Sequence, residues 1–184
     1  MKKLISLSLS MILAVALCSC GEVQESPASG SPDVPSASFD LSEYQVDAET
    51  FRGLAYEASV VLANVGTYEN NYWKALGQLS EDMPESAFAW LAENSEETRE
   101  TVSEANEDID AAYDSLTSVD FGGSNDAAQI DTEVRALYSS YSALYDLVTE
   151  PSGARENFVL SLSDLIEDIE SANDALLGLL SAGE

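Results

Sequence analysis

Apolar residues recur at alternating spacings of three and four along two long stretches in the second half of the chain. Residues 125–149 carry Ala127, Ile130, Val134, Leu137, Tyr141, Leu144 and Val148 in this spacing. Residues 154–181 carry Phe158, Leu162, Leu165, Ile169, Ala172, Leu176 and Leu179. Such spacing places each set along one face of an α-helix. The sequence therefore predicts two long amphipathic helices, one after the other.

The first half of the chain repeats the pattern twice. A helix over residues 47–79 is predicted from Phe51, Leu54, Ala58, Val61, Val65, Tyr68, Tyr72, Leu76 and Leu79. The next helix, starting at about Asp82, is predicted from Phe88, Leu91, Ser95, Thr98, Val102, Ala105, Ile109, Ala112, Leu116 and Val119. Two of these positions are polar and Asn94 is a typical helix cap, so a break near Asn94 stays open. Residues 39–46 are interpreted as a short helix or a packed arm.

Short turns rich in Gly and Pro separate the four predicted helices, at residues 80–85, 121–124 and 150–153. No segment shows a sustained period of two, so a sheet is not supported. We therefore predict an all-α fold, an antiparallel up-down four-helix bundle. The repeats are also compatible with an intermolecular coiled coil, but the short turns favour packing within one chain.

The N-terminus has the pattern of a secretory signal. Two lysines follow Met1, and an apolar run from Leu4 ends at the sequence Leu-Cys-Ser-Cys, residues 17–20. Three serines interrupt a run that is too short for a transmembrane anchor of about 20 apolar residues. The four-residue ending resembles a bacterial lipobox, with Leu17 at −3, Ser19 at −1 and Cys20 as the lipidated residue. This resemblance implies a diacylglyceryl thioether on Cys20 and an extracytoplasmic protein tethered to the cell membrane.

The predicted organisation has three parts. Residues 1–19 form the lipoprotein signal peptide, residues 20–38 the lipidated cysteine with a flexible tether, and residues 39–184 the acidic helical domain. The tether is rich in Ser and Pro and has almost no apolar residues, so it cannot offset the entropy of ordering. A flexible chain of this length reaches roughly 20–25 Å.

Charge and residue types exclude several functions. Without residues 1–19 the chain keeps five basic and all 34 acidic residues, a formal charge of −29. This charge repels nucleic acid, which is bound through Lys and Arg, and also anionic lipid headgroups. Histidine is absent from the sequence, and lipid would consume the one cysteine that remains. We therefore expect no enzyme activity, no cofactor and no histidine- or thiolate-based metal site.

The segment Tyr138–Gly153 resembles part of a group of uncharacterised lipoproteins from Gram-positive, clostridia-like bacteria. These proteins pair a helix rich in Leu-Tyr-x-x-Tyr with an Asn-Pro-Ser-Gly turn. Leu137, Tyr138 and Tyr141 match that helix, while Glu150 stands where the pattern has Asn. The resemblance implies a similar helical architecture and a Gram-positive source, and it brings no activity or site residues.

An acidic stripe is the first candidate binding surface. On the second predicted helix, acidic residues repeat every three or four positions at Glu93, Glu97, Glu100, Glu104 and Glu107. The simplest interpretation is a solvated face opposite the core. The alternative is a docking surface for a cationic partner or divalent ions, which would relieve the repulsion between adjacent carboxylates. The segment 120–126 does not supply the ligand spacing of an EF-hand calcium loop.

Aromatic residues form the second candidate site. In an up-down bundle, Trp73, Trp90 and Tyr145 fall at helix ends that meet far from the tether. They are interpreted either as a hydrophobic lid on the bundle or as an exposed anchor patch for a partner, because Trp and Tyr are common interface anchors.

The sequence thus predicts a membrane-anchored, extracytoplasmic lipoprotein with a non-catalytic binding or interaction role at the cell surface. Its partners would be the membrane, through Cys20, and a cell-envelope protein or cationic ligand. Two alternatives stay open, a binding protein for a small cationic ligand or divalent ions, and a structural spacer in the cell-wall zone.

Overall fold

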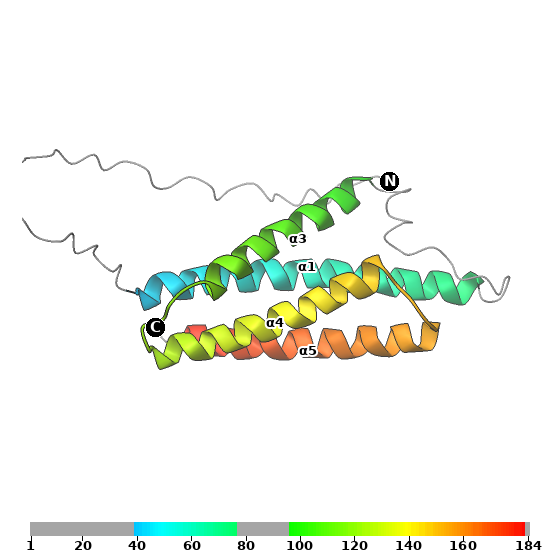
Figure 1. The fold of residues 1–184 in the computed structure, drawn as a ribbon. Helices are drawn as coiled ribbons and strands as arrows, with labels where there is room; N and C mark the ends of the chain where they lie inside the picture. The colour runs from blue at the N-terminus through cyan, green and yellow to red at the C-terminus, as the bar shows by residue number, and fades with distance from the viewer. Residues whose placement is uncertain (1–38, 77–95, 183–184) are drawn as a thin grey trace, which may run out of the picture. The chain divides into compact units, whose positions relative to one another are not determined.

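Four α-helices make up the part of the chain that the computed structural model describes, residues 39–76 and 96–182. They are α1 (Leu41–Leu76), α3 (Glu96–Thr117), α4 (Asn125–Thr149) and α5 (Arg155–Ser181). Successive labelled helices run in opposite directions, so that α1 and α4 point one way and α3 and α5 the other (Figure 1). No strand occurs within these residues. The predicted all-α, up-down bundle is confirmed.

The first helix begins earlier than the predicted start at residue 47. Asp40 caps it, because its Oδ1 accepts hydrogen bonds from the backbone N–H of Ser42 (2.9 Å) and of Glu43 (3.3 Å). Tyr44 is then a core residue of the first turns, 3% exposed. Residues 41–46 therefore belong to α1 and are not a separate arm.

The two later helices match their predicted bounds. Ser124 caps α4 through its Oγ, which accepts from the N–H of Ala127 (3.3 Å). The turn before it has two glycines in the left-handed region, Gly122 (φ 58°) and Gly123 (φ 90°), where a side chain would be strained. All seven apolar positions predicted for α4 are buried. The turn between α4 and α5 uses Gly153 in the same way (φ 84°).

The core-facing side of α1 differs from the predicted one. Of the predicted positions, Val61, Tyr68 and Tyr72 are exposed. The buried face is rotated by one residue and consists of Tyr44, Ala48, Phe51, Ala55, Ser59, Leu62, Val65, Gly66, Glu69 and Trp73. The prediction is confirmed for Phe51 and Val65 and wrong for the three exposed positions, because this face includes a serine, a glycine and a glutamate, which a search for apolar spacing does not find.

Helix α1 packs against the other three described helices, and α4 packs closely on α5. Helix α3 lies mainly against α1, through Val102, Ile109 and Leu116, and touches α4 less extensively. Three of its predicted core positions are thereby confirmed, while Val119 is 37% exposed and lies beyond the helix end. Residues 77–95, where the second predicted helix was to begin, lie outside the described part.

All described helices belong to one unit, Ala37–Glu184, which also holds every described core residue. The predicted signal peptide and tether, residues 1–38, lie outside the described residues. None of the described helices combines the length and apolarity needed to cross a membrane.

Candidate functional site

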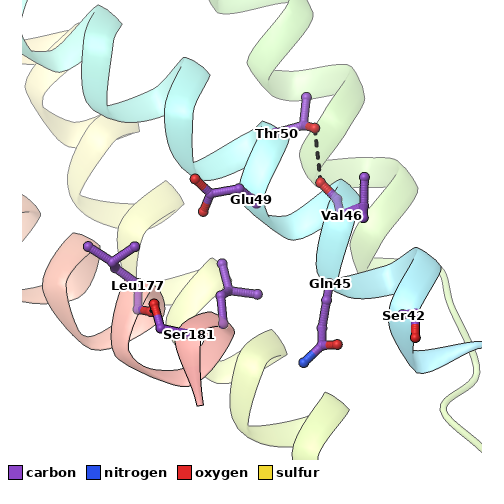
Figure 2. Close-up of a pocket in the computed structure, with 8 residues that line it drawn as sticks. Ser42, Gln45, Val46, Glu49, Thr50, Leu177 and Ser181 are labelled. Atoms are coloured by element: carbon purple, nitrogen blue, oxygen red, sulfur yellow. Dashed lines mark hydrogen bonds between the residues drawn. The ribbon is translucent and has the colours of Figure 1, made fainter. Parts of the chain in front are cut away.

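A groove opens between the first turns of α1 and the last turn of α5 (Figure 2). Its volume is about 540 Å³, within the size range of small-ligand sites. The α1 wall consists of Ser42, Gln45, Val46, Glu49 and Thr50, and the α5 wall of Leu177, Leu180 and Ser181. The groove is wide open to solvent, so it suits a chain or side chain lying along the surface rather than an enclosed ligand.

Apolar side chains stand uncovered on both walls of the groove. Val46 is 66% exposed on α1 and Leu177 is 42% exposed on α5, while Leu180 is half-buried between them and the core. The core face of α1 runs through Tyr44 and Ala48, so Val46 points away from it. Val46 and Leu177 lie outside the core cluster and offer contact area to a partner, whereas Leu180 packs against the core.

Two of the three hydroxyl groups that line the groove, those of Thr50 and Ser181, donate their hydrogens within their own helices. Thr50 donates its Oγ1–H to the carbonyl oxygen of Val46 (2.9 Å), one turn earlier in its own helix. Ser181 donates in the same way to the carbonyl of Leu177 (2.8 Å). A hydroxyl has one hydrogen and two lone pairs, so each oxygen retains acceptor capacity only.

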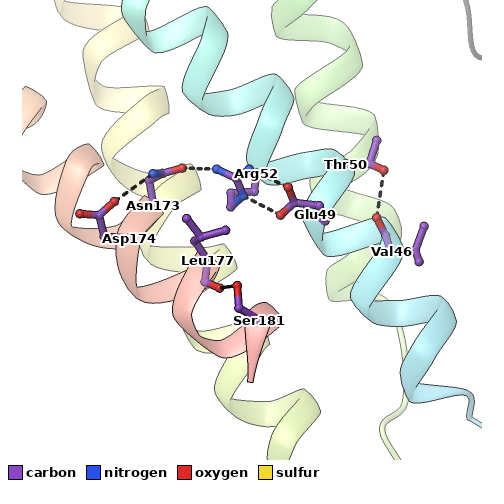
Figure 3. A network of polar contacts seen from close by, with 8 residues as sticks. All are labelled: Val46, Glu49, Thr50, Arg52, Asn173, Asp174, Leu177 and Ser181. Carbon is purple, nitrogen blue, oxygen red and sulfur yellow. Dashed lines mark hydrogen bonds and ion pairs between the residues drawn. The ribbon is translucent and has the colours of Figure 1, made fainter. Parts of the chain in front are cut away.

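Arg52 joins the two helices at the inner end of the groove (Figure 3). Its Nε and Nη2 donate to the two carboxylate oxygens of Glu49, each at 2.6 Å. Its Nη1 donates to Oδ1 of Asn173 on α5 (2.7 Å), and Nδ2 of Asn173 donates to Asp174 (3.3 Å). The hydrogen bonds from Arg52 lower the pKa of Glu49 below its ordinary value. Glu49 thus stays ionised, with half of its side chain exposed beside the groove.

A second hollow of about 510 Å³ adjoins this groove and shares Ser42 and Gln45 with it. Its remaining walls come from the start of α4, with Asp126, and from the end of α5. The two hollows lie at the same end of the described helices, and the second adds the carboxylate of Asp126 to this region.

The predicted aromatic site is not assembled as an exposed patch within the described residues. Trp73 is 4% exposed and packs edge-on against Phe158 of α5, with ring centroids 5.1 Å apart. Tyr145 is half-buried, and its ring centroid lies 6.4 Å from that of Tyr141. Trp90 lies outside the described residues. A tryptophan as buried as Trp73 is a core residue, which corresponds to the lid interpretation for this position.

The predicted acidic stripe is exposed where its side chains are described. Glu100, Glu104 and Glu107 all point to solvent along α3. Glu97 belongs to the first turn of α3, and Glu93 lies outside the described residues. Across the described ranges, no three Asp, Glu, Cys or His side chains converge in the manner of a metal site.

The tyrosine contacts between α3 and α4, here called the tyrosine seam, were not predicted from the sequence. They involve Tyr113, Tyr138 and Tyr141. The rings of Tyr113 and Tyr138 stack with centroids 3.7 Å apart and planes 7° apart. Tyr138 donates its hydroxyl to Asp110 (2.9 Å), and Tyr141 donates to Oδ1 of Asn106 (3.0 Å). Burial, together with the hydrogen bond to Asp110, raises the pKa of Tyr138 to about 12. The tyrosines at 138, 141 and 145, spaced three and four apart, were the available signal, but they do not reveal polar partners on another helix.

No protein-family model, curated protein or solved structure matches this chain.

Proposed function

We propose that this protein is a lipid-anchored, extracytoplasmic binding protein whose acidic bundle interacts, without catalysis, with a cationic partner at the cell surface. The observation that carries the proposal is an anionic surface with almost no compensating charge. The sequence has 34 acidic and seven basic residues, and two of those seven lie in the predicted signal peptide. Two others, Arg52 and Arg135, are already ion-paired with Glu49 and Asp131.

Such a charge distribution favours encounter with cations over a long range. The exposed carboxylates of α3 and of the groove region produce a field that attracts positively charged molecules and raises association rates at low salt. The same field repels anionic lipid headgroups, so the bundle stands off from the membrane at the end of its tether. A domain with these properties suits capture of a partner in the space outside the membrane.

The residue types support a non-catalytic role. The sequence lacks histidine, the commonest general base, and lipid on Cys20 would remove the remaining thiol. The open groove holds carboxylate and hydroxyl acceptors and no arrangement of nucleophile and base. These groups suit recognition of a cation.

The anchor is tested by mass spectrometry of the mature N-terminal peptide from cells that produce the protein. The proposal expects a chain that begins at a diacylglyceryl-modified Cys20, and it expects the Cys20→Ser variant to leave the membrane fraction. A mature chain that begins elsewhere without lipid would remove the anchor from the proposal.

The interaction is tested by photo-crosslinking from positions 104 and 107 of α3 in intact cells. The captured partner is then purified, and its association rate is measured between low and high salt. Electrostatic steering expects a rate that falls steeply as salt increases. A rate that does not respond to salt contradicts the steering, and the absence of any crosslinked partner favours the structural spacer.

A second candidate is a binding protein for a small cationic ligand or divalent ions, favoured by the acceptor groups of the groove. Isothermal titration with spermidine, calcium and magnesium separates the two candidates. Saturable heat with any of these probes supports the small-ligand function, whereas a surface that only docks proteins gives none.

A further inference from the structure

We infer that the groove between α1 and α5 is the docking site for a basic protein segment that carries apolar side chains next to Lys or Arg. The inference rests on the proposed function and adds to it the site and the chemistry of the partner. Three properties of the groove support this occupant. They are its exposed apolar side chains, its hydrogen-bond acceptors and the pairing of the nearby Arg52 with other side chains.

The apolar walls require a partner with apolar side chains. Val46 and Leu177 are lining residues of the groove on different helices, 66% and 42% exposed. A partner whose apolar side chains cover them would remove this surface from water, and burial of such surface is the main source of affinity at small interfaces. A purely polar cation such as a metal ion would leave these walls uncovered.

Several polar groups of the groove accept hydrogen bonds, beside the amide of Gln45 and the hydroxyl of Ser42, which can also donate. Thr50 and Ser181 donate their hydroxyl hydrogens to backbone carbonyls, so their oxygens can only accept further hydrogen bonds. Glu49 adds an ionised carboxylate that is 49% exposed, and Asp174 lies one turn from Leu177 on the α5 side. Ammonium and guanidinium groups carry several donors and no acceptor, so they match this set.

The nearby cation, Arg52, is held in place by side chains of both helices. Arg52 directs all three of its hydrogen-bonding nitrogens at Glu49 and Asn173, and no lysine or arginine lines the groove. Arg52 is therefore not among the residues that line the groove, and a cationic partner would share the carboxylate of Glu49 with it.

Other occupants fit the charges less well. A second copy of this chain would bring a formal charge of −27 toward an equally negative surface. The chain's own segment 21–38 contains no lysine or arginine, so it offers no donor cation either. A basic segment from another protein satisfies both the walls and the acceptors.

The test uses the chain from Gly21 onward, which contains the whole unit that holds the described helices and core. Its helicity and cooperative melting are first compared with those of the full-length protein. The probe is a fluorescein-labelled 14-residue peptide of Lys and Leu, with a Lys–Ser peptide and a Glu–Leu peptide of the same pattern as controls. Fluorescence anisotropy should show saturable one-to-one binding of the Lys–Leu peptide, with a Kd at least about tenfold lower than for either control.

Two pairs of matched variants locate the binding. The double variant Val46→Ser and Leu177→Ser should weaken binding about tenfold, while Leu160→Ser, at an exposed leucine of α5 outside the groove, should change it less than about twofold. Asp174→Asn should lower the salt dependence of Kd, and Asp168→Asn, which removes the same charge elsewhere on α5, should lower it less. These substitutions are at exposed positions, so the fold is expected to persist.

The outcomes separate the inference from the proposed function. The groove and control variants could have equal effects, or the Lys–Leu and Lys–Ser peptides could bind equally. Either result would mean that the peptide is attracted by the net charge of the chain. It would overturn the groove as the docking site but would leave the cation-binding role intact. Equal binding of the Glu–Leu peptide would overturn both. Self-association of the unmodified chain that the double variant abolishes, without peptide binding, would replace the basic segment by a second copy.

Discussion

The guanidinium of Arg52 on α1 donates from Nη1 to Oδ1 of Asn173 on α5 over 2.7 Å. Asn173 is 6% exposed, so this bond lies within the packed interface, while the other two nitrogens of Arg52 hold Glu49 at the surface. One side chain therefore couples the packing of two helices to the placement of a carboxylate beside the groove. The groove wall depends on an interhelical contact and not only on the helix that carries it.

Truncation of this contact should cost more than truncation of a surface polar group. Asn173→Ala removes the acceptor for Arg52 in a buried setting, so the free energy of unfolding should fall by about 1–3 kcal/mol. Asp168→Ala, at an exposed position of the same helix, should change it by less than about 0.5 kcal/mol. Urea denaturation followed by circular dichroism measures both. Equal stability of the two variants would show that the bond contributes nothing.

Two glycines inside α1 should respond differently to alanine. A Cβ on Gly53 meets no atom within 4 Å, so Gly53→Ala should raise the free energy of unfolding by about 0.5–1 kcal/mol through helix propensity alone. A Cβ on Gly66 would lie 3.0 Å from Cδ1 of Leu162 and 3.3 Å from Cγ2 of Val148. Gly66→Ala should therefore gain less than Gly53→Ala, or lose stability. A larger gain at Gly66 would show that Leu162 moves aside freely. Thermal melting of the two variants in parallel decides the order.

The contrast between α1 and α4 shows what the sequence could and could not predict. In α4 every core position is apolar, and the periodicity found both its bounds and its buried face. In α1 the core face includes Ser59, Gly66 and Glu69, so the periodicity found the helix but misassigned part of its buried face. Whether a polar or small residue lies in the core depends on the side chains that other helices place beside it. The spacing of residues within one segment carries no information about those side chains.

The groove could not be predicted from the sequence for a similar reason. Its polar residues are ordinary surface types, and their chemistry depends on hydrogen bonds such as that of Thr50 with its own helix and that of Arg52 across to α5. Trp73 illustrates the converse, since its residue type suggested an exposed anchor but packing against Phe158 buries it. The type of a residue is compatible with several roles, and its packing in the folded chain determines which role it has.

The tyrosine seam should make a measurable contribution to the docking of α3. Tyr138 stacks on Tyr113 and also donates to Asp110, so removal of either partner affects the other. A double-mutant cycle with Tyr113→Ala and Tyr138→Ala should give a coupling energy of about 0.5–1.5 kcal/mol. Tyr138→Phe keeps the stack and loses only the hydrogen bond, so it should cost less than Tyr138→Ala. Additive effects of the two alanine variants would mean that the stack is incidental.

Alkaline pH should destabilise the protein through its buried tyrosines, and Tyr44 is the clearest case. Its side chain is 3% exposed, and burial, together with the charge of Asp131, raises its pKa to about 12. A phenol whose pKa is higher in the folded than in the unfolded chain stabilises the fold fully below the unfolded pKa of about 10, and this stabilisation is lost as pH rises toward 12. The free energy of unfolding should therefore fall between pH 10 and 12.

Tyr44→Phe isolates this contribution. The hydroxyl of Tyr44 is buried and has no hydrogen-bond partner among the described residues, so its removal should leave the stability at pH 8 unchanged or slightly higher. Between pH 10 and 12 the variant should lose about 1–2 kcal/mol less than the parent, because phenylalanine has no proton to release. Tyr72→Phe, at an exposed position of the same helix, controls for the loss of one hydroxyl. Denaturant titrations at a series of pH values measure the difference, and parallel curves for Tyr44→Phe and the parent would assign the alkaline loss to other groups.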